Sequence, residues 1–218
     1  MTKQQLARKI DHTILKPDAT FSAIRDTILY ARQVEAATVC LNPAYVSLAA
    51  GLLAGSATAV CTVIGFPLGA TSTWAKARET ENAYLHGARE MDMVINISAL
   101  KSGNLDFVYR DIAAVVDASP APVKVILENC YLSKEEIITG CELATKAGAS
   151  FVKTSTGFGP SGATVEDVRL MRAHTPPAMK IKAAGGIASL ADAMAMLDAG
   201  ADRLGLIRTA ALLAELGE

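Results

Sequence analysis

Two lysines interrupt apolar runs of the sequence, and they are the residues best suited to carry chemistry. Lys153 lies in the run FVKT at residues 151–154, and Lys182 lies directly before the run AAGG at residues 183–186. Burial and a neighbouring cation both disfavour the ammonium form of a lysine and so free its lone pair. Such an amine can attack a carbonyl carbon and form an iminium. The alternative for Lys153 is structural, as a lysine at a strand edge or in an ion pair.

A carboxylate, Asp92, interrupts a third apolar run, MDMVIN at residues 91–96. A buried carboxylate without a partner is costly, so we expect Asp92 to pair with a lysine. The pair could also carry a proton during catalysis. A purely stabilising ion pair is the alternative, and the two interpretations are compatible. Lys180 shares the parity of Lys182 but lies nearer the start of its run, which favours a structural role.

Glycines after the seventh apolar run indicate an anion site. Gly185 and Gly186 could expose backbone N–H groups, and the eighth run leads into a helix whose N-terminus favours anions. A simple tight turn explains this glycine pair equally well. The histidines His12, His86 and His174 are scattered, with no HxH or HExxH pattern, so we predict neither a metal nor any other cofactor.

Eight short apolar or β-branched runs could position these side chains. Each run starts roughly 20 to 32 residues after the previous one, which is the length of one βα unit. This repetition predicts a single (β/α)8 TIM barrel that occupies residues 1–218 as one domain. The main competitor is an open doubly wound sheet, which usually has a glycine-rich turn after its first strand; here Lys16-Pro17-Asp18 follows instead. The predicted strands are Ile10–Leu15, Thr38–Leu41, Ala59–Gly65, Met91–Ile97, Val123–Glu128, Phe151–Thr154, Lys180–Ala183 and Arg203–Ile207.

Helix signals fill the gaps between these runs. Ser133 followed by Glu136 predicts a capping box, and Thr164 followed by Asp167 predicts a second capped helix start. Three Gly-Ala pairs, beginning at Gly87, Gly148 and Gly200, precede strands and suit left-handed helix C-caps.

The composition excludes several classes of partner. The chain has 218 residues, 51% of them hydrophobic and 20% charged, with a formal net charge of −1. This balance gives no electrostatic case for a nucleic-acid or membrane partner. The N-terminal residues do not form a signal peptide, and the four cysteines show no CxxC pattern. Reduced thiols in a cytoplasmic protein are the expectation.

The order of these segments resembles the class I deoxyribose-phosphate aldolase family over almost the whole chain. The resemblance implies a metal-free barrel that cleaves 2-deoxy-D-ribose 5-phosphate to acetaldehyde and D-glyceraldehyde 3-phosphate, with a Schiff base on Lys153. It also implies that Asp92 and Lys182 relay protons and tune the amine, and that the family's frequent homodimer is formed. The matching segments are IDHT at 10–13, VCLNP at 39–43, TVIGFPLG at 62–69, EMDMVIN at 90–96, VKVILE at 123–128, FVKTSTGF at 151–158 and KAAGG at 182–186.

The resemblance extends to the residues around the substrate. Thr154, Thr156 and Asp11 are expected to hold hydroxyl groups and water. Cys40 is either a small core residue or, if it faces the lumen, a thiol open to alkylation by an enal. The remaining expected substrate contacts are Thr13, Gly157, Gly185, Gly186, Gly205 and Arg208.

Two segments depart from the family pattern. Leu206-Ile207-Arg208 stands where small hydroxyl residues usually hold the phosphate, and Ala188 stands where arginine is common. Either Arg208 takes over the phosphate as a cation, or the pocket prefers an unphosphorylated acceptor. The first alternative function is therefore a carboligase of unphosphorylated aldehydes, and the second is a non-catalytic sugar-phosphate-binding barrel. Natural divergence and laboratory alteration would both produce such a segment.

Overall fold

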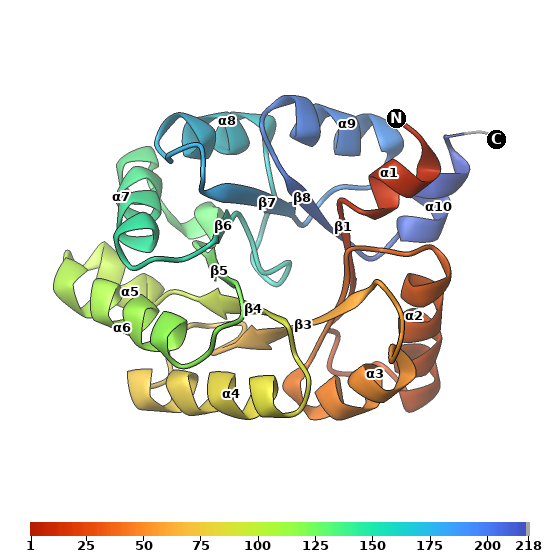
Figure 1. Ribbon diagram of the computed structural model, residues 1–218. Helices are drawn as coiled ribbons and strands as arrows, with labels where there is room; N and C mark the ends of the chain where they lie inside the picture. Colours follow the sequence, from red (N-terminus) through yellow and green to blue (C-terminus); the bar gives the residue numbers. More distant parts are fainter. Residues whose placement is uncertain (217–218) are drawn as a thin grey trace.

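Eight parallel strands form one closed barrel, in a computed structural model that describes residues 1–216 (Figure 1). Strands follow one another around the ring in chain order, and β8 closes it by pairing with β1. The predicted (β/α)8 fold is therefore confirmed. Gly217 and Glu218, the end of the predicted domain, lie outside the described residues. The strands are β1 (Ile10–Ile14), β2 (Thr38–Leu41), β3 (Ala59–Ile64), β4 (Glu90–Val94), β5 (Val123–Ile126), β6 (Phe151–Lys153), β7 (Lys180–Ala184) and β8 (Arg203–Leu206).

Helices surround the strands, as Figure 1 shows. Within the described residues, no helix combines the length and apolar character needed to cross a membrane. The helices are α1 (Lys3–Ala7), α2 (Phe21–Gln33), α3 (Val46–Leu52), α4 (Thr73–Leu85), α5 (Ile97–Lys101), α6 (Leu105–Asp117), α7 (Lys134–Lys146), α8 (Val165–Ala173), α9 (Leu190–Asp198) and α10 (Thr209–Ala214), with short 3₁₀ helices η1 (Pro43–Tyr45) and η2 (Asn129–Tyr131).

The predicted helix ends are confirmed. Ser133 and Glu136 form a reciprocal capping box at the start of α7, and the Thr164 side chain accepts a hydrogen bond from the backbone of Asp167. The glycines of all three Gly-Ala pairs have positive φ, at 112° for Gly87, 80° for Gly148 and 110° for Gly200. Side chains with a Cβ rarely adopt this conformation, so glycine suits these helix ends.

Two strands end two or three residues earlier than predicted, and four others (β1, β3, β6 and β8) end one residue earlier. β4 stops at Val94 because Asn96 leaves the strand to cap α5, where its side chain accepts from the backbone of Ala99 at 2.9 Å. β5 stops at Ile126, and Glu128 beyond it has a left-handed backbone with φ at 58°. That conformation is strained for a side chain with a Cβ and turns the chain sharply at the barrel rim.

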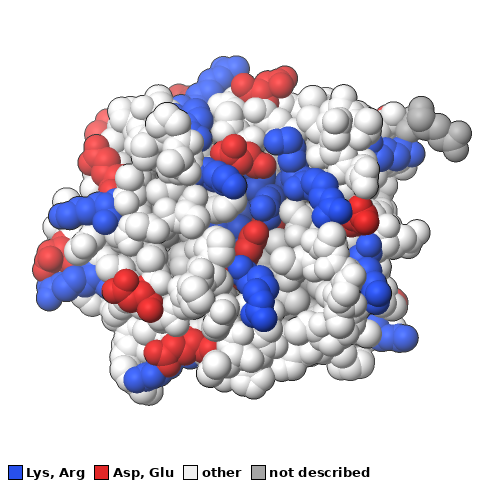
Figure 2. Space-filling model, viewed as in Figure 1, with Lys and Arg blue, Asp and Glu red and all other residues white. Residues whose placement is uncertain are grey.

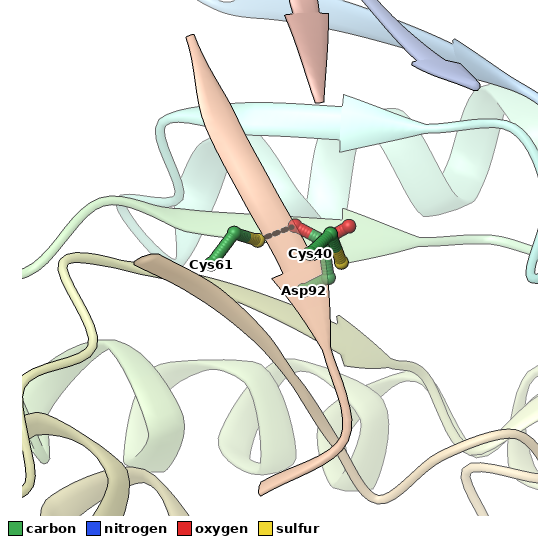
Figure 3. Close-up of side chains that lie close together, drawn as sticks. All are labelled: Cys40, Cys61 and Asp92. Carbon is green, nitrogen blue, oxygen red and sulfur yellow. Dashed lines mark hydrogen bonds between the residues drawn. The ribbon is translucent and has the colours of Figure 1, made fainter. Parts of the chain in front are cut away.

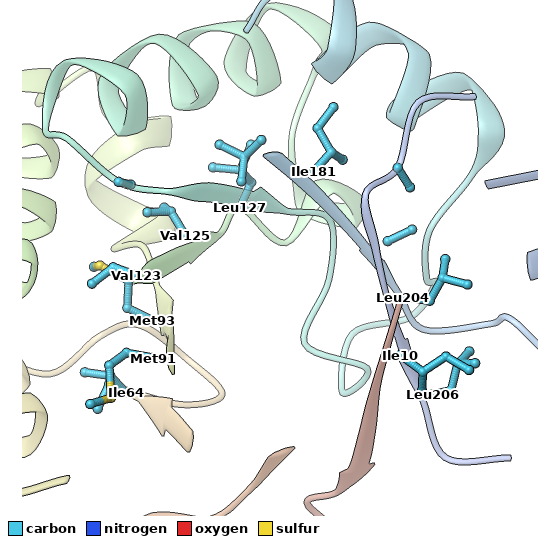
Figure 4. Packing of buried hydrophobic residues seen from close by; sticks show 14 of the residues in the cluster. Ile10, Ile64, Met91, Met93, Val123, Val125, Leu127, Ile181, Leu204 and Leu206 are labelled. Atoms are coloured by element: carbon cyan, nitrogen blue, oxygen red, sulfur yellow. The ribbon is translucent and has the colours of Figure 1, made fainter. Parts of the chain in front are cut away.

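Alternate strand residues divide between two environments. The outward face packs under the helices and includes Val125, Ile181 and Leu204, all fully buried in the main core (Figure 4). Their neighbours Lys124 and Lys182 point the other way, because successive residues of a strand face opposite sides. The ionic side chains therefore lie inside the barrel.

The barrel lumen is apolar on one side. A small separate cluster from the first three strands and their ends joins Leu15, Cys40, Cys61 and Val63, with Phe66 packed against it. Charged side chains from β1 and from β4 to β8 line the rest of the lumen. A ligand in this lumen would meet an apolar wall on one side and an ionic wall on the other.

Candidate active site

One carboxylate oxygen of Asp92 contacts both of the predicted lysines. The Nζ atoms of Lys153 and Lys182 each lie 2.7 Å from Oδ2 of Asp92. The three side chains come from β4, β6 and β7, and Lys153 and Lys182 are direct neighbours in the register of β6 and β7. The three residues singled out from the sequence are thus brought together inside the barrel.

A third lysine, Lys124, completes the surroundings of Asp92. Its Nζ lies 2.8 Å from Oδ1 of Asp92 and 2.7 Å from Oε2 of Glu90. Lys124 and Asp92 are Cα partners on β5 and β4. The sequence predicts a lysine on this strand but indicates no role for it. The role follows only from the register of β4 and β5, which pairs Lys124 with Asp92.

Asp11 and Arg203 extend the ionic cluster across β1 and β8. Asp11 lies 2.5 Å from Lys182 and 2.5 Å from Arg203, and Arg203 lies 3.2 Å from Glu90. Asp11 is fully buried. The structure therefore places it as an ion partner beneath Lys182, instead of the expected holder of hydroxyl groups and water.

The opposite charges of this cluster stabilise the ionised forms of Asp92 and Lys182. Burial by itself would raise the pKa of Asp92, but Lys124, Lys153 and Lys182 overcome it and hold that pKa well below its ordinary value. Burial would lower the pKa of Lys182, but Asp11 and Asp92 outweigh it, and the pKa is raised. At neutral pH Asp92 is therefore ionised and Lys182 is a cation next to Lys153.

A cavity of about 360 Å³ opens onto Lys153. Lys153 is 2% exposed, so its amine can be reached while most of its stem is buried. The predicted contacts that line the cavity are Thr13, Thr156, Gly157, Gly185, Gly186, Gly205 and Arg208. Ile207 and Ala188, which depart from the family pattern, line it as well, and the lining residues that the sequence did not indicate are Leu15, Lys16, Ala184 and Ile187.

Two predicted contacts are buried in the protein. Thr154 donates a hydrogen bond of 3.2 Å to the backbone oxygen of Ala184, which joins the ends of β6 and β7. Cys40 is fully buried in the apolar lumen wall. Both of its alternatives from the sequence, core packing and lumen position, are thus met by one location.

Backbone geometry shapes the open end of the cavity. Gly185 and Gly186 have φ of 81° and 77°. A Cβ on Gly162 would lie 2.3 Å from the backbone carbon and oxygen of Gly185, so the loop after β6 packs directly on the loop after β7. The carboxylate of Glu128 accepts from the backbone nitrogen of Thr156 at 3.0 Å and from its hydroxyl group. Glu128 thereby fixes a residue of the cavity wall.

In the part of the chain that the structure describes, two groups of side chains bring possible metal-ligand atoms within 4.8 Å of one another: Cys40, Cys61 and Asp92 (Figure 3), and Asp11, Cys61 and Glu90. The Sγ of Cys61 lies 3.2 Å from Oδ1 of Asp92 and 3.2 Å from Nζ of Lys124. Ammonium groups already contact both oxygens of this carboxylate and repel a metal ion. The donor set therefore fits hydrogen bonding better than metal binding.

His12, on β1, is a neutral side chain in this arrangement. Its Nδ1 lies 2.8 Å from the hydroxyl of Thr209, and burial lowers the pKa of His12 to about 4. On the outer surface, basic and acidic side chains are mixed over the face shown in Figure 2.

A closed barrel with a reachable amine beside a cation and a carboxylate defines a (β/α)8 enzyme equipped for carbonyl chemistry. The chain belongs to the DeoC/LacD family of aldolases, whose family model matches residues 6–211. It is therefore an aldehyde-lyase.

Known proteins support this assignment in sequence and in structure. A deoxyribose-phosphate aldolase from Streptococcus gordonii is 56% identical over 202 residues, which cover 92% of each chain. A crystal structure of a candidate deoxyribose-phosphate aldolase from Coccidioides immitis superposes with a TM-score of 0.96 at 41% identity, covering 99% of this chain and 87% of that one. A tetrameric deoxyribose phosphate aldolase from Aeropyrum pernix superposes with a TM-score of 0.92 at 32% identity, covering 99% of this chain and 92% of that one.

Proposed function

We propose that the chain cleaves 2-deoxy-D-ribose 5-phosphate reversibly to acetaldehyde and D-glyceraldehyde 3-phosphate through a Schiff base on Lys153. One observation carries the proposal: the amine of Lys153 borders the cavity and shares an Asp92 oxygen with Lys182. The name of the Streptococcus gordonii relative supplies the substrate.

The ion pairs of the lumen single out Lys153 among its basic side chains. Four basic side chains (Lys124, Lys153, Lys182 and Arg203) meet three carboxylates (Asp11, Glu90 and Asp92), which leaves one positive charge in excess when all are ionised. Within the described residues Lys153 contacts one carboxylate, whereas Lys182 contacts two and Lys124 three. Lys153 also lines the cavity, so it is the lysine of this cluster that a carbonyl compound can reach.

The reaction begins at the amine of Lys153. Nζ of Lys153 attacks the aldehyde carbon of the open sugar, and the carbonyl oxygen leaves as water to give an iminium. A proton leaves the 3-hydroxyl through water and the Asp92–Lys182 pair, and the C2–C3 bond breaks with its electrons moving into the iminium. D-Glyceraldehyde 3-phosphate departs. Protonation of the enamine and hydrolysis then release acetaldehyde and restore Lys153.

Side chains of the chain perform each of these steps, so the proposed mechanism requires no metal or cofactor. Thr13 and Thr156, which line the cavity, are placed to contact the sugar hydroxyls. The free cysteines support a cytoplasmic enzyme. For its assembly we propose a homo-oligomer; the expectation from the sequence is a dimer, and the Aeropyrum pernix relative is a tetramer. The proposed partners are small aldehydes and sugar phosphates, with no nucleic acid or membrane.

The phosphate would lie at the mouth of the cavity. Lys16 and Arg208 supply two exposed cations there, and Gly185, Gly186 and Gly205 leave backbone open for close approach. Ile207, 67% exposed at the same mouth, favours a second candidate function, the joining of unphosphorylated aldehydes. The same Schiff-base chemistry serves both. Comparing kcat/KM for phosphorylated and plain acceptors separates them.

Reductive trapping tests the covalent step. Borohydride added with acetaldehyde should attach a reduced two-carbon group to Lys153, located by peptide mass mapping. Lys153→Leu should abolish both the label and the cleavage, while Lys180→Leu, which alters an exposed lysine, should keep both. Label on another lysine would refute the proposed nucleophile. Full activity of Lys153→Leu would refute the mechanism, and binding without turnover in the wild type would favour a sugar-phosphate-binding barrel.

A further inference from the structure

Cys40 and Cys61 lie directly opposite each other inside the barrel. They are Cα partners on the adjacent strands β2 and β3, and both are fully buried. Their Sγ atoms lie within 4.8 Å of each other and beside the carboxylate of Asp92 (Figure 3). Adjacent strands are about 4.8 Å apart, which falls within the Cα separation of disulfides, about 4.4–6.8 Å. A change of side-chain torsion could therefore join these two sulfurs.

The two thiols differ in their surroundings. Cys61 donates to Oδ1 of Asp92, and burial raises the pKa of Cys61 well above its ordinary value. The pKa of Cys40 is instead lowered, chiefly by the adjacent Cys61 side chain. Cys40 is thus the better nucleophile of the pair, and Cys61 is placed to react second. Both thiols are fully buried, so a small oxidant must reach Cys40 from the cavity by displacing Leu15, which lines the cavity and packs in the same cluster as both cysteines.

We propose that hydrogen peroxide converts Cys40 and Cys61 into a reversible disulfide that switches the active site off. The Cys40 sulfur attacks a peroxide oxygen, the O–O bond breaks, and the departing hydroxide takes the thiol proton to form water. The Cys61 sulfur then attacks the resulting sulfenic acid, the S–O bond breaks, and a second water leaves with the proton of Cys61. Two thiols are oxidised and one peroxide is reduced to two waters.

The disulfide would act on Asp92 and on the apolar wall. It removes the S–H group that Cys61 donates to Asp92, and it moves the Cys61 sulfur, which now lies 3.2 Å from Lys124. It also reshapes the wall that Leu15 and Val63 share with both cysteines. A charge-assisted hydrogen bond is lost beside the reacting groups, so we expect kcat/KM to fall by about tenfold or more. Formation of the disulfide depends only on the two thiols. Its effect on turnover depends on the function proposed above.

Peptide mapping of the full chain tests the linkage. The protein is treated with hydrogen peroxide, free thiols are alkylated, and chymotrypsin then cuts after Tyr45, between the two cysteines. Peptides containing Cys40 and Cys61 should be joined, and dithiothreitol should separate them. Cys141→Ser, which alters a cysteine on α7, should form the same link. Cys61→Ser should instead leave over-oxidised Cys40.

Each outcome decides a separate point. If both cysteines are alkylated after peroxide treatment, or if either joins Cys130 or Cys141, the proposed pair is wrong; this holds in the wild type even if Cys61→Ser fails to fold. A disulfide that forms without lowering kcat/KM refutes the switch. A disulfide in an enzyme that never cleaves deoxyribose phosphate refutes the proposed function and leaves the thiol pair standing.

Discussion

Lys124 contacts the Oδ1 atom of Asp92 at 2.8 Å, which leaves the Oδ2 atom to the other two lumen lysines. Together with the Cys61 thiol on Oδ1 and the two lysines on Oδ2, this contact fixes the orientation of the carboxylate. It also adds the cation that brings the cluster to one excess positive charge. Lys124 is therefore a positioning residue for Lys153.

The variant Lys124→Met should impair formation of the Schiff base. Oδ1 of Asp92 would lose its ammonium partner, so the carboxylate would be held less firmly beside Lys153 and kcat/KM at neutral pH should fall by about 10- to 100-fold. The rate of borohydride trapping at Lys153 should fall with it, while KM should change little because Lys124 lies outside the cavity lining. Lys180→Met, on the exposed end of β7, should leave both quantities unchanged. An unchanged trapping rate in Lys124→Met would show that Lys124 is only structural.

Arg208→Ala should weaken recognition of the phosphate. Loss of one charge-assisted hydrogen bond predicts a KM for deoxyribose phosphate about tenfold or more higher, with little change for unphosphorylated aldehydes. Steady-state kinetics on both substrates measure the difference. Arg169→Ala, which removes an exposed arginine from α8, is the matched control. Equal KM values in Arg208→Ala and the wild type would favour the unphosphorylated-acceptor hypothesis.

The sequence identified the eight strands because runs buried on both faces of a parallel sheet are apolar nearly throughout. It placed Lys153, Asp92 and Lys182 because charged residues in such runs are rare. It could not assign Lys124, since a lysine between valines has the same pattern at a sheet edge and in a lumen. Only the closure of the ring, which aligns Lys124 with Asp92, gives it a role. The left-handed turn at Glu128 has no sequence signal at all.

Histidine burial should make stability depend on pH. The pKa of His12 is lowered to about 4 in the folded chain, whereas an unfolded chain has the ordinary value near 6.5. Between these two values the unfolded chain binds a proton that the folded chain does not bind. The contribution of neutral His12 to the free energy of unfolding is therefore fully present above pH 6.5 and is lost as the pH falls toward 4. Between pH 7.5 and 5 this contribution falls by about 2 kcal/mol.

Urea unfolding at the two pH values measures this loss. The variant His12→Gln should lose about 2 kcal/mol less than the wild type over the same interval. His86→Gln, which changes an exposed histidine at the end of α4, should behave as the wild type does. If His12→Gln and the wild type lose stability equally, His12 is not held neutral in the folded chain.

A second buried ion pair, between Lys76 on α4 and Asp111 on α6, should stabilise the fold without touching substrate. Nζ of Lys76 lies 2.5 Å from Oδ2 of Asp111, and both side chains are fully buried. Lys76→Met leaves a buried carboxylate unpaired and should lower the free energy of unfolding by about 3–5 kcal/mol. The double variant Lys76→Met with Asp111→Leu should recover most of that loss, because the charge and its partner disappear together.

Chemical denaturation of the single and double variants forms a complete cycle. Asp106→Asn breaks the exposed pair with Arg110 and should cost less than about 1 kcal/mol. If the double variant were as unstable as Lys76→Met, packing volume and not the unpaired charge would account for the loss.

The division of the lumen into an apolar and an ionic wall bears on stereochemistry. A two-carbon aldehyde attached to Lys153 has a methyl end suited to Leu15 and Val63 and a nitrogen end suited to Asp92. The enamine derived from it is therefore oriented by these two walls, with its nucleophilic CH2 carbon open to the cavity. That carbon remains a CH2 group in the product, so the new stereocentre is the carbonyl carbon of the acceptor. Its handedness is set by the face of the acceptor that the cavity walls turn toward the enamine.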